Sequence, residues 1–275
     1  MLKVLRPGPS LSFQGAPRVN QLRFGIAPCG PLHPSAASLA NELLLNREHS
    51  TLLEIGLGGA QLEVLEDTWL AHTGGLQCEI LPTGTAQLCR KGQVLTFNPG
   101  SGVWSYLSAP GGFSTDESFG STSYHARSDI GQQIRSGETV RACSSSELFP
   151  RNVRRRINQP QGNGAIRVMT APHTSEFPSA NRLFHASYQV STSIDRTGYQ
   201  LIGPELECRL QIKSLPLIPG CIQVPPSGQP IVTLNDGPTV GGYPLVGIVH
   251  PEDLPKLVQT APGKDINFVP HEHGE

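Results

Sequence analysis

The chain has 275 residues, enough for one large domain or two small ones with a sizeable buried core. Its 21 basic and 22 acidic residues leave a net charge of −1, which argues against a nucleic-acid partner bound through its phosphates. Glycine and proline number 30 and 25, and apolar stretches are spread along the chain. This composition predicts a mainly β protein with many tight turns rather than a disordered chain.

The sequence contains no run of 18 apolar residues, so we expect no membrane partner. The first eight residues lack the apolar region of a signal peptide, and the expected location is the cytoplasm. The six cysteines form no CxxC pair, which indicates reduced thiols rather than disulfides or a zinc site. His271-Glu272-His273 is interpreted as a disordered tail, and no metal site is predicted.

In chain order, the first expected element is a helix over Ser35–Leu45, in which Leu39, Leu43 and Leu44 give one apolar face. Short strands separated by Gly or Pro corners follow. They are predicted at Gln61–Leu65, Thr68–Ala71, Gln77–Leu81, Val94–Phe97 and Val103–Ser108. This density of short strands is typical of a barrel or a sandwich.

Residues 111–164 are rich in Gly, Ser, Arg and Asn, and we interpret them as a loop-rich connector between β domains at 1–110 and 165–275. Four arginines gather near its end, at Arg151, Arg154, Arg155 and Arg156. They are either an anion-binding or docking surface or a solvated basic linker, and the linker is the commoner case.

The last part is predicted to contain short helices at Ser179–Phe184 and Glu252–Gln259. Leu206–Ile212 has the clearest strand pattern, with alternating apolar and polar residues. The other strands are predicted at Ile166–Met169, Ser187–Val190, Gln200–Ile202, Ile222–Val224, Pro230–Leu234, Pro244–Val249 and Ile266–Phe268.

An internal echo links the two β domains. Residues 91–99 and 262–270 both read as Gly, two residues, an apolar residue, one more residue, Phe, any residue and Pro. We therefore expect two related β units, one in each half of the chain.

The sequence lacks the motifs of several known enzyme classes. It has no GxSxG nucleophile elbow, no GxxxxGK[ST] phosphate loop and no HExxH zinc motif. None of its five lysines is flanked by Met as a biotin-carrier lysine is, so biotin is not expected to be attached to this chain.

The most informative stretch is residues 219–249, which are dense in Gly, Pro and amide side chains. Gly241-Gly242 allows a backbone to approach a ligand or a neighbouring strand closely. Gln223, Gln229, Asn235 and Asp236 offer hydrogen bonds to an amide or carboxylate ligand. The alternative is a set of turns whose polar side chains satisfy backbone groups.

This stretch closely resembles the C-terminal signature of a family that includes the C subunit of 5-oxoprolinase. The family is also called allophanate hydrolase subunit 2 or the biotin-dependent carboxyltransferase family. Its pattern PG-x-IQVPP-x-GQPI stands here at Pro219–Ile231, and D-x-x-T-x-GGYP at Asp236–Pro244. Weaker landmarks resemble the rest of the family pattern, at Ser105–Phe113, Tyr188–Pro204 and Leu254–Phe268. The resemblance covers about residues 1–270.

The chain departs from the family pattern at four places. Ser12-Phe13-Gln14-Gly15 and Gly30-Pro31-Leu32-His33 each lack an acid, Asp195 replaces the usual Asn, and Thr170-Ala171-Pro172 lacks a Gly. If the two missing acids bind substrate, this member has altered or no activity. A non-catalytic scaffold or regulatory module therefore stays open as an alternative.

The resemblance implies cyclophilin-like distorted β-barrels, as two β units with a few short helices. It implies partners that resemble the B and A subunits of 5-oxoprolinase, and the ATP-dependent opening of 5-oxoproline to glutamate. ATP is expected in the complex, and a partner subunit is one candidate to bind it. A second reading implied by the same family is carboxyl transfer from biotin to urea or a related amide substrate.

Opening a lactam requires a polarised amide oxygen, an attacking water and stabilisation of the oxyanion. In this reading Arg196 pairs with a carboxylate or phosphate, and Asp236 acts as a base or an orienting acceptor. The residues assigned to substrate binding are Gln223, Gln229 and Asn235, which hold the amide, together with Thr239, the backbone donors Gly241 and Gly242, and Tyr243, which packs on the ligand.

Overall fold

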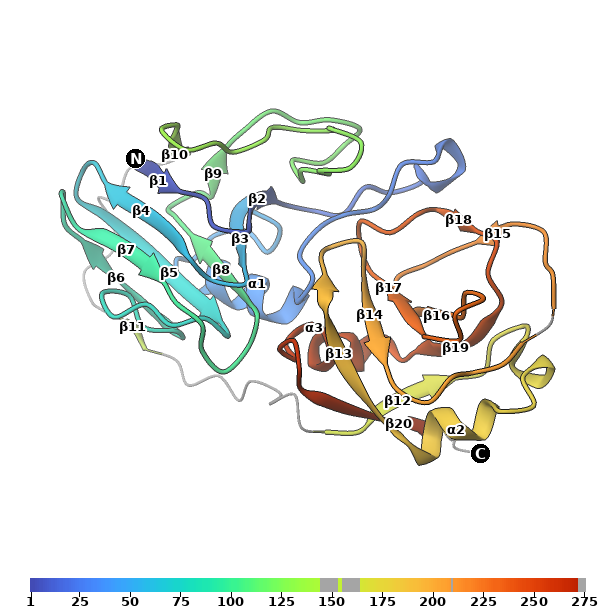
Figure 1. Cartoon of the computed structure of the whole chain (residues 1–275). Helices are drawn as coiled ribbons and strands as arrows, with labels where there is room; N and C mark the ends of the chain where they lie inside the picture. Colours follow the sequence, from blue (N-terminus) through green and yellow to red (C-terminus); the bar gives the residue numbers. More distant parts are fainter. Residues whose placement is uncertain (144–152, 155–163, 209, 272–275) are drawn as a thin grey trace. The chain divides into compact units, whose positions relative to one another are not determined.

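The computed structural model describes residues 1–143, 153–154, 164–208 and 210–271. The chain divides into two compact units (Figure 1). Unit 1 consists of Met1–Val19 and Cys29–Gln159, and unit 2 of Asn20–Pro28 and Pro160–Glu275. Arg151, Arg155 and Arg156 of the expected basic cluster lie outside the described residues.

Unit 1 consists of two β-sheets and one α-helix. One sheet has the order β7-β4-β1-β10-β9 and the other β11-β6-β5-β8-β3-β2. The strands are β1 (Leu2–Arg6), β2 (Ser10–Gln14), β3 (Leu52–Gly56), β4 (Ala60–Val64), β5 (Thr68–Gly74), β6 (Thr85–Cys89), β7 (Val94–Phe97), β8 (Trp104–Ser108), β9 (Phe113–Ser114), β10 (Thr139–Ala142) and β11 (Val153–Arg154). Residues 111–164, expected as a connector, thus supply three strands of unit 1.

The core of unit 1 lies between the two sheets. Leu62 and Phe97 from the five-stranded sheet pack in one apolar cluster with Leu53 and Leu70 from the six-stranded sheet. Strands β3, β5 and β8 are buried along their whole length, because the helix α1 (Pro34–Glu42) covers their second face. A strand buried on both faces loses the alternating pattern, which hides it from a search for period two.

Helix α1 has a cap at each end. The Nδ1 atom of His33 accepts a hydrogen bond from the Ala36 backbone N–H at 3.3 Å. At the other end, the N–H of Asn46 donates to the Asn41 carbonyl at 2.9 Å, with Leu45 in the left-handed region at φ 55°. This is the Schellman motif, in which the left-handed position is usually Gly. The expected helix over Ser35–Leu45 is confirmed, but it stops at Glu42.

Unit 2 is a closed seven-stranded barrel with the order β12-β19-β16-β17-β14-β13-β20 (Figure 1). The barrel strands are β12 (Ile166–Met169), β13 (Ser187–Ile194), β14 (Gly198–Ile202), β16 (Cys221–Gln223), β17 (Ile231–Thr233), β19 (Leu245–Val249) and β20 (Asp265–Pro270). The remaining elements are the α-helices α2 (Ala180–His185) and α3 (Leu254–Val258), the 3₁₀ turns η1 (Leu22–Phe24), η2 (Thr174–Glu176) and η3 (Pro251–Asp253), and the paired strands β15 (Leu215–Pro216) and β18 (Val240–Gly241). The expectation of a mainly β fold with few short helices is confirmed.

A buried carboxylate fastens the first strand of the barrel. Asp253, 1% exposed, accepts hydrogen bonds from the backbone N–H of Arg167 at 2.9 Å and from its Nε at 2.8 Å. The Nζ of Lys256 lies 2.8 Å from the same carboxylate. Burial alone would raise the pKa of Asp253, but the hydrogen bonds from Arg167 and Lys256 lower it by more.

The internal echo of the sequence is repeated in the backbone. The N–H of Gly92 donates to the Val64 carbonyl at 2.7 Å, and that of Gly263 to the Val190 carbonyl at 2.8 Å. In both places the residue after the Gly accepts a bond back from Val64 or Val190, at 2.8 and 2.9 Å. Both glycines have positive φ, 84° and 79°, and both turns lead into a strand. The two segments therefore play the same part in their own units.

Two strands that the sequence predicts do not form. The described residues of Leu206–Ile212 contain no strand, because the barrel is already closed and offers no free edge to pair with. The stretch Gln77–Leu81 makes one isolated bridge, Gln77 with Asn98, and the Leu81 carbonyl bonds to His72 Nδ1 at 2.8 Å instead of to a strand.

No helix in the described ranges is long and apolar enough to span a membrane.

Candidate functional site

Arg196 sits on the turn between β13 and β14. The Asp195 carboxylate shapes this turn, since its Oδ1 accepts the backbone N–H of Thr197 at 2.7 Å and that of Gly198 at 3.2 Å. An Asn side chain has an equivalent acceptor oxygen. The family's usual Asn and the Asp of this chain can therefore build the same turn.

Arg196 and Asp236 form a buried, bidentate ion pair. Arg196 Nε donates to Asp236 Oδ2 at 2.9 Å, and Nη2 donates to Oδ1 at 2.8 Å. The side chains are only 8% and 5% exposed. The Asp236 N–H also donates to the Arg196 carbonyl at 3.0 Å. The two turns that carry these residues are thus joined through side chains and backbone, which favours a positioning role for the pair.

Gln223 is a buried amide at the end of β16. Its side chain is 6% exposed, and within the described ranges it has no hydrogen-bond partner. A Cβ on Gly241 would lie 2.5 Å from Gln223 Oε1 and 2.6 Å from Leu217 Cδ1, so a larger residue here would push the ends of both side chains aside. Its amide atoms are not among the fully enclosed unpaired atoms of the described residues, so water reaches the Gln223 amide and a polar ligand can take the place of that water.

The amide of Gln229 is used by the fold. Its Nε2 donates to the Gly203 carbonyl at 3.1 Å, and its Oε1 accepts the Gly203 N–H at 3.0 Å. This pairing is the pattern expected of a side chain that satisfies backbone groups. Its assignment to substrate binding stays a prediction.

The other predicted binding residues surround these groups. Asn235 is half-buried beside Asp236. Thr239 is half-buried and its carbonyl accepts the Leu217 N–H at 2.9 Å. Gly242 is exposed, and Tyr243 is 44% exposed.

The predicted site residues fall into two clusters at opposite ends of β17. Gln223 pairs with Ile231, the first residue of β17, and faces Gly241. Asp236 follows Thr233, the last residue of β17, by three positions. Both clusters lie in unit 2, on the strand-and-turn segment that the sequence analysis singled out.

Unit 1 shows what occupies the two positions where the family acids are missing. Gly15 stands where the first acid is missing, and its backbone N–H donates to Ser123 Oγ at 3.0 Å. The preceding Gln14 side chain is fully buried, and its Nε2 donates to Ser12 Oγ at 2.9 Å and to the Tyr124 carbonyl at 3.2 Å. His33 caps α1, a position at which Asp is also favoured. Burial lowers the pKa of His33 to about 4, although a backbone hydrogen bond raises it slightly, so the ring is neutral at pH 7.

One buried acid escaped the sequence analysis. Glu54 lies in the middle of β3 with no exposed surface, and its Oε2 accepts the Leu32 N–H at 2.8 Å. The signal was an acid inside an apolar run, Leu52-Leu53-Glu54-Ile55, at a position that turned out to be buried. Glu54 thus supplies a carboxylate to the segment whose own acid is missing.

Comparison with known proteins agrees with the resemblance. Residues 24–270 match the model of the carboxyltransferase domain, subdomain A and B. The chain belongs to this family. It is 32% identical to the C subunit of 5-oxoprolinase from Escherichia coli (strain K12), over 98% of this chain and 91% of that protein.

Two longer proteins contain the same kind of domain. The chain is 27% identical to urea amidolyase of Saccharomyces cerevisiae (strain ATCC 204508 / S288c), over 98% of this chain but 16% of that protein. The crystal structure of TTHA0988 matches with a TM-score of 0.87 and 33% identity, over 98% of this chain. This chain spans only 56% of the TTHA0988 chain. The carboxyltransferase-family fold therefore occurs within larger chains as well as in a separate subunit.

Proposed function

We propose that this chain is the carboxyltransferase-family subunit of an ATP-dependent 5-oxoprolinase, which opens the lactam of 5-oxoproline to glutamate. The observation that carries the proposal is the 32% identity with the C subunit of 5-oxoprolinase across nearly the whole of both proteins. Proteins that resemble the A and B subunits of such an enzyme are the partners we propose, because the name of that relative describes one subunit of an assembly.

We propose that Gln223 recognises the lactam through two hydrogen bonds. A five-membered lactam presents its N–H and C=O side by side on one edge, and a primary amide presents the complementary pair. Gln223 Nε2 would donate to the lactam oxygen while Oε1 accepts the lactam N–H. The hydrogen bond from Nε2 would strengthen as negative charge grows on that oxygen during the attack of water.

Arg196 and Asp236 then act as positioning residues. Each carboxylate oxygen of Asp236 already accepts one charge-assisted bond from Arg196. The pair fixes the turn at Asn235 against the turn at Thr197, whose carbonyl accepts the Leu234 N–H at 2.9 Å. The direct catalytic role first assigned to both residues stays a prediction.

Arg196, the residue predicted to pair with a carboxylate or phosphate, is not placed to bind the phosphates of ATP. Arg196 turns its bidentate edge to Asp236, and the sequence has no phosphate loop. We therefore propose that ATP is used in the assembled complex at a partner's site, and we derive no step of this chain through it.

Carboxyl transfer to urea or a related amide is the second candidate. The match to urea amidolyase favours it, and urea presents the same N–H and C=O edge to Gln223. No lysine of this chain has the surroundings of a biotin-carrier lysine, so carboxybiotin would have to come from a partner.

Reconstitution separates the two candidates. The chain is co-expressed with the partners that resemble the A and B subunits, and glutamate release from 5-oxoproline is measured with and without ATP. The proposal predicts ATP-dependent release that avidin does not inhibit. Avidin-sensitive consumption of urea, with no glutamate release, would support the second candidate instead. A complex that assembles but performs neither reaction would support the scaffold alternative.

A further inference from the structure

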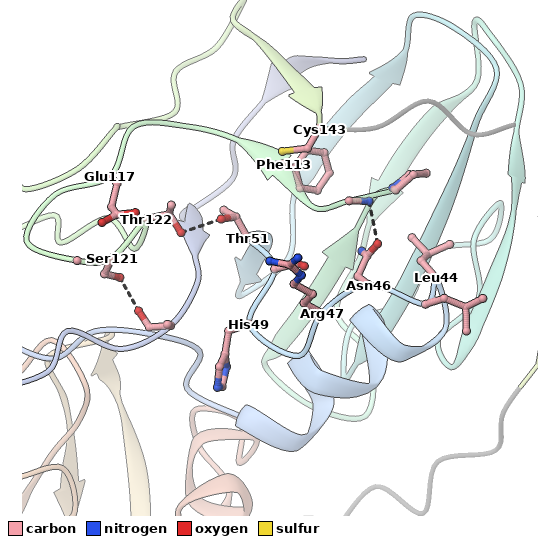
Figure 2. A pocket seen from close by; sticks show the side chains of 16 residues that line it. Leu44, Asn46, Arg47, His49, Thr51, Phe113, Glu117, Ser121, Thr122 and Cys143 are labelled. Atoms are coloured by element: carbon pink, nitrogen blue, oxygen red, sulfur yellow. Dashed lines mark hydrogen bonds between the residues drawn. The ribbon is translucent and has the colours of Figure 1, made fainter. Parts of the chain in front are cut away.

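Unit 1 contains a cavity of about 700 Å³ that no part of the proposed function uses (Figure 2). Its walls come from the loop that follows α1 and from the segment around β9, and every residue that lines it belongs to unit 1. The volume is in the range typical of small-molecule sites.

The wall around α1 is held in place by the Asn46 side chain (Figure 2). Asn46 Oδ1 accepts the Gly111 N–H at 2.8 Å, and its Nδ2 donates to the Ala109 carbonyl at 2.8 Å and to Ser108 Oγ at 3.0 Å. Asn46 therefore ties the loop after α1 to the loop after β8. This wall does not need a ligand to form it.

Apolar side chains contribute to the lining of the cavity. Leu44 and Phe113 line it and are 1% and 2% exposed. Leu45 also lines the cavity, is 86% exposed and has a φ of 55° that is unfavourable for a bulky residue.

Charged groups complete the lining. Arg47 and His49 come from the loop after α1, and Glu117 comes from the segment after β9 (Figure 2). Arg47 and Glu117 are exposed, and within the described part of the chain neither has an ion pair or a side-chain hydrogen bond. An arginine without an ion pair among the described residues, in a cavity that is also lined by apolar side chains, suits a carboxylate.

We infer that this cavity binds a small organic monocarboxylate with an apolar tail. Its carboxylate pairs with Arg47, and its tail covers Leu44, Leu45 and Phe113. Glu117 disfavours ligands that carry a second negative charge. The site is independent of the Gln223 cluster, which lies in unit 2.

The alkylation rate of Cys143 reports whether a ligand occupies the cavity. It lines the cavity and is exposed, whereas Cys29, Cys78, Cys89 and Cys221 are buried and Cys208 is partly buried. In a C208S variant of the full chain, the rate of Cys143 alkylation by uncharged N-ethylmaleimide is followed by mass spectrometry. The probes are 4-phenylbutyrate, the alcohol 4-phenylbutanol and the amine 4-phenylbutylamine.

The inference predicts that 4-phenylbutyrate slows alkylation in a saturable way and that the alcohol and the amine do not. R47M weakens the protection by about tenfold, while R135M, which changes an exposed arginine outside the cavity, leaves it unchanged. Ligand-observed NMR provides a second readout of binding that does not depend on the thiol.

Arg47-dependent binding by NMR supports the inference even if the thiol stays reactive. Equal protection by the alcohol, or equal binding to the R47M protein in both assays, would overturn it. Absence of binding in both assays would also overturn it. Neither assay needs other proteins or turnover, so these outcomes are separate from those that test the proposed function.

Discussion

Arg196 and Asp236 lie 40 residues apart in the sequence, and their side chains meet at 2.8 and 2.9 Å in a pair almost closed to solvent. The pair joins the β13–β14 turn to the turn that follows β17. Removing one partner would leave a charge buried without compensation, which typically costs about 3–5 kcal/mol.

We therefore expect D236N to lower the free energy of unfolding by about 3 kcal/mol, measured by urea denaturation of the full chain. The double variant R196M/D236L, which removes both charges, should regain part of that loss. If D236N matches the wild-type urea midpoint, the pair is not structural and its direct catalytic assignment gains weight.

A second prediction concerns adjacent glycines. In G241A the new methyl group would lie 2.5 Å from Gln223 Oε1 and would displace that amide, whereas at Gly242 the nearest atom to a new Cβ is Ser214 Oγ at 3.9 Å. We expect G241A to reduce kcat/KM of the reconstituted complex by about tenfold or more. G242A, the matched control, should keep wild-type turnover. Equal activity of the two variants would show that the position of Gln223 does not matter.

The third prediction is a loss of stability in acid. His72 is fully buried against Phe97, and burial lowers its pKa to about 4, although a bond to the Leu81 carbonyl raises it slightly. In the unfolded chain the pKa returns to about 6.5, so the unfolded state takes up the proton first as the pH falls. The contribution of His72 is therefore complete above pH 6.5 and is lost as the pH falls toward 4.

Urea midpoints measured between pH 7.5 and pH 4.5, a range that runs from above the unfolded-state pKa toward the folded-state pKa, test this directly. We expect the wild-type unfolding free energy to fall by on the order of 1 kcal/mol per pH unit for each such histidine. The unfolding free energy of H72N should depend less steeply on pH, while the contribution of His33 to that dependence remains. Parallel pH profiles for the wild type and H72N would contradict the burial argument.

The fourth prediction uses the strained end of α1. Leu45 occupies the left-handed position of the Schellman motif and is 86% exposed, so L45G should relieve strain without loss of packing. We expect a gain of about 1 kcal/mol in unfolding free energy. L45A, which keeps a Cβ, is the control and should show no gain. Destabilisation by L45G would mean that the leucine side chain contributes more than its exposure suggests.

Sequence patterns predicted the fold well where apolar residues alternate or where turns are marked by Gly and Pro. They missed β1, β2, β3 and β6. In β3 the acid Glu54 interrupts an apolar run, whereas β5 and β8, which are also buried along their whole length, were predicted. They also predicted a strand at Leu206–Ile212 from its alternating pattern. No strand forms among its described residues, because the closed barrel leaves no edge for it to pair with. Periodicity describes one segment, whereas a strand also needs a partner.

The candidate site could be predicted only as a set of residues. The family motif contains Gln223, Gln229 and Asp236 within one short stretch of sequence, yet the fold gives their side chains different surroundings. The Gln229 side chain bonds to the backbone of Gly203 and the Asp236 side chain to Arg196, whereas the Gln223 side chain bonds to no described residue. Such pairings depend on contacts between distant strands, which a linear pattern does not carry.

The most direct test of the account is glutamate release from 5-oxoproline by the reconstituted complex that carries Q223A. If Gln223 holds the lactam, kcat/KM falls by about tenfold to a hundredfold, while Q211A, an exposed glutamine of the same unit, turns over like the wild type. Wild-type turnover by the Q223A complex would contradict the central claim.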